Sequence, residues 1–194
     1  MNKIGIIAGG GKLPLAIGKS LSNSKFLIKF FCIESFSDFN HYKNYDFVKI
    51  KLNSLSKIIK VLKENEINKI LMAGYVKRPS IKDINFDLST IKLIKNYALD
   101  SKGDDKLLKA ISIFFENNGF KVFDWKKNCK DLFISEDLLT RVKPSKAALL
   151  NKSKGLEIFN IIGKADISQS MIIQNKIVLG LEAAEGTDEL ILRC

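Results

Sequence analysis

A run of three glycines and a lysine is the first feature of this sequence that could do chemistry. The glycines at positions 9–11 and Lys12, the glycine loop, follow a short β-branched segment and precede Pro14, where a helix is expected to begin. Glycines let a backbone approach a phosphate closely, and unpaired amides at a helix start attract anions. The loop has neither GxGxxG nor Walker A spacing. It predicts phosphate or nucleotide binding, with a tight strand-to-helix turn as the alternative.

A second loop, residues 74–80, follows the apolar segment 69–73 and combines a glycine, the ring of Tyr75 and two cations. Loops at the carboxyl ends of neighbouring parallel strands form the ligand crevice of an open α/β sheet. The two loops therefore predict one cleft for an anionic ligand that carries a ring. Glu34, after another apolar run, lies where dinucleotide-binding sheets place an acid on a ribose, although a solvated strand end explains it equally well.

Carboxylates gather at two further places. Asp104 and Asp105 follow a glycine at the start of a predicted helix, where one aspartate is expected to cap the helix and the second could contact magnesium or a ribose. The acid cluster, residues 182–188 (Glu-Ala-Ala-Glu-Gly-Thr-Asp), places three carboxylates and a hydroxyl between a predicted strand and a predicted helix. Its last two residues would suffice to cap that helix, so its two glutamates indicate a functional site.

The sequence gives little support to nucleophilic or zinc chemistry. His41 is the single histidine and lies in a polar stretch, so a Ser-His-Asp or Cys-His hydrolase is not expected. Cys32, Cys129 and Cys194 are far apart and have neither the spacing of a disulfide framework nor that of a zinc site. We therefore expect chemistry that depends on carboxylates, backbone amides and a divalent metal.

These segments require a scaffold that alternates strands and helices. Short apolar runs predict strands, and the amphipathic segments between them predict helices. The predicted strands are 3–8, 26–33, 47–52, 69–73 and 120–125, and the predicted helices are 13–22, 54–65, 88–99 and 104–117. This alternation is typical of a parallel sheet covered on both faces. The predicted fold class is α/β, with a Rossmann-like N-terminal domain.

The pattern changes after residue 130. Residues 140–145 are predicted to form a linker, and Ser145 is predicted to cap a helix that runs to Ile161. Two strands, 171–174 and 177–181, then predict a hairpin, and a final helix begins at Glu189. We expect an N-terminal domain at 1–133 and a partial mixed α+β C-terminal domain at 134–194, incomplete because its final predicted helix has only begun at Cys194.

Composition excludes several classes of protein. The 194 residues are 46% hydrophobic and carry a net charge of +11, which fits a globular chain rather than a disordered one. The 29 lysines outnumber the 3 arginines, which argues against a nucleic-acid partner because phosphate and base readers rely on the bidentate fork of arginine. Residues 1–130 carry a net +12, which favours an anionic ligand or membrane surface. No signal peptide or apolar stretch of about 20 residues occurs, so a cytoplasmic location is expected.

Four motifs, in their order and spacing, resemble the LpxI family, the UDP-2,3-diacylglucosamine pyrophosphatases of lipid A synthesis in Gram-negative bacteria. They are Ile-Ala-Gly-Gly-Gly-Lys-Leu-Pro at 7–14, Ala-Gly-Tyr-Val-Lys-Arg-Pro-Ser at 73–80, Gly-Asp-Asp-Lys-Leu-Leu at 103–108 and the acid cluster at 182–188. The resemblance implies a cytoplasmic, metal-dependent hydrolase in which water attacks the phosphorus on the sugar side, giving lipid X (2,3-diacylglucosamine 1-phosphate) and UMP. It also implies a Rossmann-like N-terminal domain, a C-terminal domain of its own type and a substrate bound between them.

The residues and the resemblance together give a set of candidates. The catalytic candidates are Thr187 and Asp188, and the candidates for binding Mg²⁺ or another divalent ion are Asp104 and Asp105. The substrate-binding candidates are Gly9, Gly10, Gly11, Lys12, Leu13, Gly74, Tyr75, Val76, Lys77, Arg78, Gln169, Glu182, Glu185 and Gly186. The expected partner is a UDP-linked lipid substrate, not a nucleic acid, while peripheral contact with the inner membrane and a homodimer stay open.

The sequence departs from the family pattern after the acid cluster. Family chains continue there with Lys-Pro, Gln-Asp-x-Arg and Asp-Leu-Pro segments, whose aspartate is regarded as essential for catalysis, and these segments are absent from this sequence. We therefore expect a chain that retains much of the substrate-binding surface and does not turn over. The alternative is a nucleotide- or dinucleotide-binding Rossmann-like module without hydrolase activity, which a preference for NAD or NADP over UMP would reveal.

Overall fold

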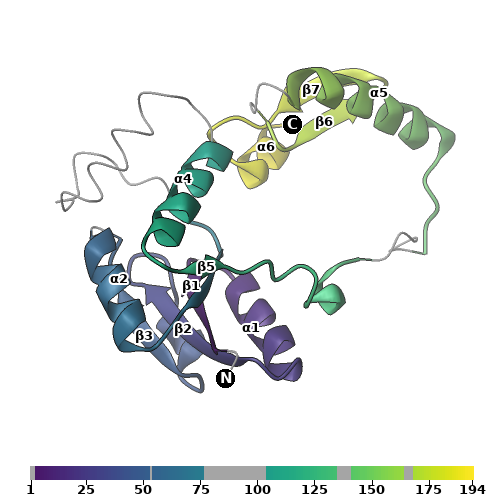
Figure 1. Cartoon of the computed structure of the whole chain (residues 1–194). Coiled ribbons are helices and arrows are strands. Elements are labelled where there is room, and N and C mark those ends of the chain that lie inside the picture. The colour runs from purple at the N-terminus through teal and green to yellow at the C-terminus, as the bar shows by residue number, and fades with distance from the viewer. Residues whose placement is uncertain (1–2, 53, 77–103, 135–140, 164–167) are drawn as a thin grey trace. The chain divides into compact units, whose positions relative to one another are not determined.

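The computed structural model describes residues 3–52, 54–76, 104–134, 141–163 and 168–194, with only the backbone described at 104–107. The chain divides into two compact units, Met1–Ser135 and Glu136–Cys194 (Figure 1). Among the described residues, no helix combines the length and the apolar character that crossing a membrane requires.

Five parallel strands form the sheet of the first unit: β1 (Lys3–Ala8), β2 (Leu27–Ile33), β3 (Phe47–Ile50), β4 (Lys69–Ala73) and β5 (Lys121–Val122). Their order across the sheet is β3-β2-β1-β4-β5, and each neighbouring pair is parallel. The α/β fold class predicted from the sequence is thereby confirmed. In this order the chain runs outward from β1 to β3 and then returns to pair β4 with the other edge of β1, so the topological switch point lies between β1 and β4.

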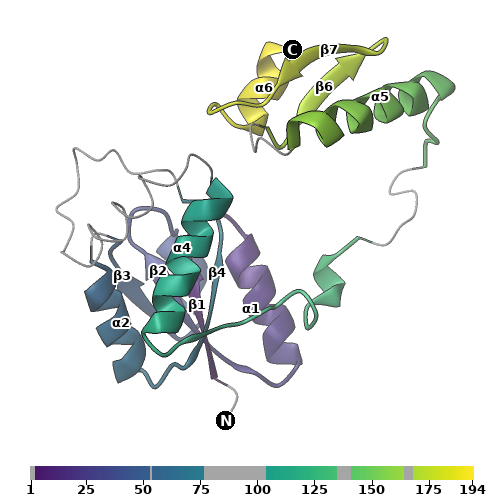
Figure 2. The ribbon, with the colours of Figure 1, turned by 45° about the horizontal axis from the view of Figure 1, so that its top comes forward.

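Helices cover both faces of this sheet (Figures 1 and 2). Helix α1 (Leu13–Asn23) packs on one face with the short 3₁₀ helices η1 (Phe39–Tyr42) and η3 (Lys130–Leu132). Helices α2 (Leu55–Glu64) and α4 (Asp104–Asn117) pack on the other face. Strands buried on both faces need apolar side chains at successive positions, which explains the uninterrupted apolar runs in the sequence.

Helix α2 illustrates how the sequence specifies these elements. Its residues Leu55, Ile58 and Leu62 are buried, while the lysines at 57, 60 and 63 are exposed, as expected for an amphipathic helix on a sheet. The Ser54 hydroxyl caps the helix by accepting a hydrogen bond from the Lys57 amide at 3.3 Å. Such a cap typically contributes about 1 kcal/mol to stability. The predicted helix and its cap are confirmed.

The second unit comprises helix α5 (Lys146–Ile162), strands β6 (Met171–Gln174) and β7 (Ile177–Leu181), and helix α6 (Thr187–Arg193). The two strands pair antiparallel as the predicted hairpin. Both turn residues, Asn175 and Lys176, have positive φ angles of 51° and 64°, as a two-residue hairpin of the type I′ class requires.

Two elements differ from the sequence prediction, and a third cannot be compared with it. The strand predicted at 120–125 pairs only at Lys121–Val122, because the Asp124 carboxylate accepts a hydrogen bond from the Lys126 amide at 3.1 Å and turns the chain away. Helix α6 begins two residues before Glu189, directly after Gly186, whose φ of 90° ends the preceding turn. The helix predicted at 88–99 lies outside the described residues.

Candidate functional site

The glycine loop and the start of the tyrosine loop, residues 74–76, meet at the switch point of the sheet. The Gly9 amide donates a hydrogen bond to the Ala73 carbonyl at 2.8 Å. The Gly10 amide donates to the Tyr75 carbonyl at 2.8 Å, and the Tyr75 amide donates back to the Gly10 carbonyl at 3.1 Å. The two loops that the sequence assigned to one cleft are thus joined by backbone hydrogen bonds.

This close approach explains why glycines occupy these positions. A Cβ atom on Gly9 would lie 2.5 Å from the Tyr75 carbonyl oxygen, and one on Gly10 would lie 2.3 Å from the Tyr75 ring. Gly74 has a φ of +90°, and a Cβ atom there would lie 2.6 Å from the Gly10 carbonyl oxygen. Close packing between the two loops therefore explains why positions 9, 10 and 74 are glycines, without any need for a ligand. The sequence alone did not reveal this reason.

The amides that remain open lie further along the glycine loop. The amides of Gly11, Lys12 and Leu13 have no hydrogen-bond partner among the described residues. The Lys12 side chain makes no capping bond to α1, and Pro14, in the first turn, has no N–H. Since the N-terminus of a helix carries partial positive charge, these three amides form the part of the loop suited to an anion.

An exposed aromatic ring lies beside these amides. Tyr75 is 62% exposed, and its ring carbons come within 3.7 Å of the position that a Cβ atom of Gly11 would occupy. Val76, the next residue, is also exposed. The tyrosine loop thus offers a flat apolar surface next to the open amides, while the predicted site residues Lys77 and Arg78 lie outside the described residues.

Glu34, for which a ribose contact and a solvated strand end were equally open, forms an ion pair. Glu34 follows β2, and its carboxylate lies 3.6 Å from the Lys51 ammonium in an exposed pair. Exposed pairs of this kind add little to stability. The arrangement favours the solvated strand end over a ribose contact.

The acid cluster in the second unit satisfies much of its own hydrogen-bonding capacity. The Thr187 hydroxyl donates to the Glu182 carboxylate at 2.9 Å and lies 3.2 Å from the hydroxyl of Ser170, which follows the exposed Gln169. The Glu182 amide in turn donates to the Ser170 carbonyl at 2.9 Å. Thr187 and Glu182 therefore connect α6 to the end of β7 and to the segment before β6.

Glu185 is engaged by an arginine from α6. Its carboxylate accepts hydrogen bonds from Arg193 Nη2 at 2.9 Å and Nε at 3.2 Å, and from the Ala183 amide at 3.2 Å. The pKa of Glu185 is lowered, first by a hydrogen bond from its own amide and then by Arg193. The Asp188 carboxylate, exposed in the first turn of α6, has no hydrogen-bond partner among the described residues. Of the two residues predicted to be catalytic, Thr187 is hydrogen-bonded, whereas Asp188 keeps a carboxylate without a partner among the described residues.

Comparison with known proteins identifies the family of this chain. Residues 3–132 match the LpxI N-terminal domain, and residues 135–194 match the LpxI C-terminal domain. The chain belongs to the LpxI family. The chain is also 28% identical over 196 residues to a protein of Caulobacter vibrioides named UDP-2,3-diacylglucosamine pyrophosphatase LpxI, an alignment that covers 100% of this chain and 69% of the relative. The family resemblance read from four motifs is therefore confirmed.

The metal that the LpxI resemblance implies has no visible cluster of ligands. No group of three or more histidine, cysteine, aspartate or glutamate side chains that could hold a metal ion occurs among the described residues. Asp104 and Asp105 begin α4, but their side chains lie outside the description. Magnesium therefore stays a proposal.

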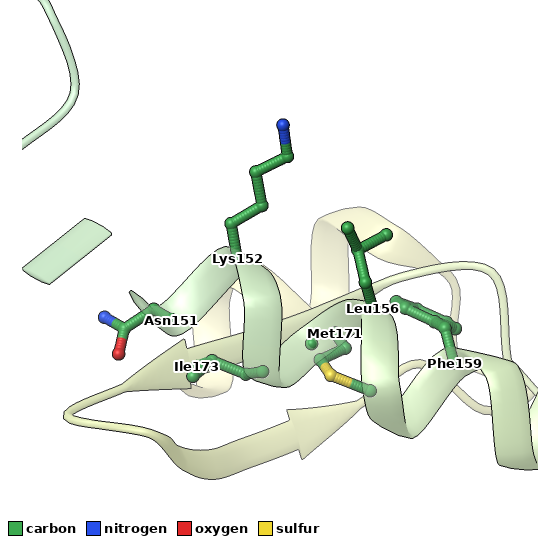
Figure 3. A pocket seen from close by; sticks show the side chains of 7 residues that line it. Asn151, Lys152, Leu156, Phe159, Met171 and Ile173 are labelled. Carbon is green, nitrogen blue, oxygen red and sulfur yellow. The ribbon is translucent and has the colours of Figure 1, made fainter. Parts of the chain in front are cut away.

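One apolar groove lies in the part of the chain matched to the LpxI C-terminal domain. It has a volume of about 340 Å³, and Figure 3 shows it between α5 and β6. Its lining residues are Asn151, Lys152, Gly155, Leu156, Phe159, Met171 and Ile173. The Lys152 ammonium points away from the strands (Figure 3), and the side-chain Oδ1 of Asn151 accepts a hydrogen bond from the Lys176 amide at 2.8 Å. The groove contains none of the predicted site residues and has no group suited to phosphate chemistry.

Proposed function

We propose that this chain acts in the hydrolysis of the pyrophosphate bond of UDP-2,3-diacylglucosamine, and that its first unit binds the UMP half of that substrate. Membership of the LpxI family and the name of the Caulobacter relative support the substrate class. The observation that carries the proposal is the set of three open amides at the switch point of the sheet, beside an exposed tyrosine ring. Rossmann-like sheets bind nucleotides at this position.

The open amides suit a phosphate, and the ring suits a base. The amides of Gly11, Lys12 and Leu13 would donate hydrogen bonds to the phosphate of UMP, with the partial positive charge of the α1 N-terminus favouring the anion. The exposed Lys12 ammonium adds long-range attraction. The Tyr75 ring would stack against the uracil base, an interaction that favours a nucleotide over inorganic phosphate.

The chemistry of the reaction makes the same amides useful beyond binding. Water attacks the phosphorus on the sugar side, the bond from that phosphorus to the bridging oxygen breaks, and the bridging oxygen leaves with UMP. Negative charge therefore develops on the phosphate of UMP as the bond breaks. Amides already oriented toward that phosphate would stabilise the transition state more than the ground state.

The second unit supplies the proposed catalytic side chains. The Asp188 carboxylate is open and could accept a proton from the attacking water, whereas the Thr187 hydroxyl is held on Glu182 and is better suited to fix the start of α6. Replacement of Asp188 by asparagine keeps the size of the side chain and removes the base. Where the chain releases UMP, Asp188→Asn should lower the rate of release by about 100-fold, the lower end of the range for a general base.

Binding and turnover need separate experiments. Thermal shift of the full chain should show stabilisation by UMP and by UDP-2,3-diacylglucosamine, each measured with magnesium and with EDTA. Release of UMP in ¹⁸O-labelled water, followed by ³¹P NMR, measures turnover, and the label should enter lipid X. Label in UMP would contradict attack on the sugar side, and equal rates in EDTA would contradict a role for magnesium. Binding without release would limit the chain to substrate binding.

The dinucleotide-binding module is the second candidate, and the same screen tests it. The glycine loop lacks the GxGxxG spacing, and the carboxylate of Glu34 pairs with Lys51. The missing GxGxxG spacing argues against NAD, whereas the Glu34–Lys51 pair does not distinguish NAD from UMP, because both ligands contain a ribose. Stabilisation by NAD or NADP alone, with no response to UMP, would overturn the proposed function.

A further inference from the structure

A buried serine, Ser37, spans the ends of the first two strands beneath the glycine loop. It is 8% exposed, and its hydroxyl donates a hydrogen bond to the Ala8 carbonyl at 2.8 Å, with a longer contact of 3.4 Å to the Gly9 carbonyl. The Ser37 amide donates to the Ile33 carbonyl at the end of β2 at 2.9 Å. Both its backbone and its side chain are thus anchored, so the hydroxyl occupies a fixed position over the end of β1.

The Ser37 hydroxyl helps to fix the orientation of the peptide group between Ala8 and Gly9. The carbonyl of Ala8 and the amide of Gly9 belong to the same planar trans peptide and therefore point in opposite directions. Ser37 binds the carbonyl from the β2 side, and the Ala73 carbonyl binds the amide from the β4 side at 2.8 Å. This peptide is held at both ends, and it immediately precedes the glycines whose orientation determines where the open amides point.

The hydrogen bond from the Ser37 hydroxyl to the Ala8 carbonyl lies among buried residues. Cys32 lies opposite Ala8 in the β1–β2 register and is fully buried. Burial raises the pKa of the Cys32 thiol to about 12, so the group is a neutral thiol at pH 7. The neighbouring Tyr42 is 1% exposed, and its hydroxyl has no hydrogen-bond partner among the described residues. The β1–β2 ladder already pairs the Ala8 carbonyl with the Ile33 amide, so loss of the Ser37 hydroxyl would remove one of two hydrogen bonds to this carbonyl.

We propose that Ser37 is a positioning residue for the nucleotide-binding loop: by fixing the peptide between Ala8 and Gly9, it keeps the amides of residues 11–13 aimed at the phosphate of the ligand. The inference rests on the proposed function for its ligand and on the hydrogen bonds above for its geometry. Ser37 does not touch the phosphate itself, because its hydroxyl proton is used on Ala8.

Two measurements on the full chain test this role. The first is amide hydrogen exchange at Gly9 and Gly10, whose amides are buried and hydrogen-bonded. We expect Ser37→Ala to accelerate exchange there by about fivefold to tenfold, the equivalent of one lost hydrogen bond. The second is the Kd for UMP from NMR titration, which should rise by roughly the same factor.

Two matched variants separate positioning from general destabilisation. Ser37→Thr keeps the hydroxyl and should restore both readouts. Ser20→Ala removes another buried hydroxyl from the same unit, one that lies in the second half of α1 and is bonded to Asp131, and it should change neither readout. Circular dichroism and thermal melting would show that each variant is folded.

The outcomes distinguish this inference from the proposed function. Unchanged exchange at Gly9 and Gly10 in Ser37→Ala overturns the positioning role, whatever happens to UMP. Faster exchange with an unchanged Kd overturns it as well, because the loop would then be free to move without effect on binding. A wild-type chain that does not bind UMP overturns the proposed function, and the exchange rates then still decide whether Ser37 holds the loop.

Discussion

The glycine loop and the acid cluster both carry residues suited to chemistry, but they differ in how much hydrogen-bonding capacity they leave unused. In the glycine loop, the amides of Gly9 and Gly10 are used on the strand β4 side, while those of Gly11 and Lys12, and of Leu13 directly after the loop, stay open. In the acid cluster, Glu182 is bound to Thr187 and Glu185 to Arg193, so among its side chains only Asp188 lacks a partner within the described residues. Although both regions are rich in polar groups, the glycine loop leaves donors free for a ligand, whereas the acid cluster uses most of its hydrogen-bonding groups on its own neighbours.

This difference shows that residue type is a weaker guide to function than unused donors and acceptors. A donor that already has a good partner gains little from a ligand, because binding must first break the existing bond. The two glutamates indicated a functional site in the sequence, yet their geometry also fits a cap that attaches α6 to the hairpin. The following predictions test whether the two regions differ in this way.

The largest effect is expected from Gly9→Ala. The new Cβ atom would lie 2.5 Å from the Tyr75 carbonyl oxygen, so the tyrosine loop must move and the bonds between Gly10 and Tyr75 must weaken. We expect a loss of about 2–3 kcal/mol in the free energy of unfolding, the range for overpacking a close contact, together with loss of UMP binding. Urea denaturation measures the first quantity and NMR titration the second.

Gly163→Ala is the matched control in the other unit. Gly163 has a φ of −60°, and a Cβ atom there would have no neighbour within 4 Å in the described part of the chain. Its replacement should change stability by less than about 1 kcal/mol and leave UMP binding intact. Equal losses in the two variants would show that the glycine loop has no special packing requirement.

A smaller effect is expected from removal of the Tyr75 ring. Tyr75→Ala removes the exposed surface proposed to stack on the base and should weaken UMP binding by about 1–3 kcal/mol. Tyr75→Phe keeps the ring and should bind UMP like the wild type. An unchanged Kd in Tyr75→Ala, measured by isothermal titration calorimetry, would exclude a stacking role.

The smallest effect concerns the acid cluster. The pKa of Glu185 is lowered in the folded state, so its ionic form stabilises the second unit above the unfolded-state pKa, and this contribution is lost as the pH falls through the folded-state pKa. Arg193→Gln should raise the pKa of Glu185 toward its ordinary value, as measured by ¹³C NMR of the carboxyl carbon. UMP binding should stay the same. A fall in UMP affinity would contradict the assignment of the nucleotide to the first unit.

Local patterns predicted much of this fold. The hairpin at 171–181 was located correctly because alternating apolar runs and a two-residue turn are neighbours in sequence, and Ser54 was recognised as a cap because its partner is three residues away. The strand predicted at 120–125 was too long because the turn at Asp124 depends on a side-chain hydrogen bond that periodicity does not express.

Long-range contacts limited what could be predicted about the candidate site. The packing reason for Gly9 and Gly10 lies in Tyr75, which only the pairing of β1 with β4 brings near. Ser37 had no local signal, because its partner Ala8 is 29 residues away. The sequence could therefore indicate the loops, but not which of their amides are open or what holds them in place.

Titration of the ¹⁵N-labelled full chain with UMP tests the central claim most directly. The account predicts that the largest amide shift changes occur at Gly11, Lys12 and Leu13 and around Tyr75, while the amides of 182–188 stay unperturbed. Shift changes confined to the acid cluster, or no saturable change at the glycine loop, would contradict it.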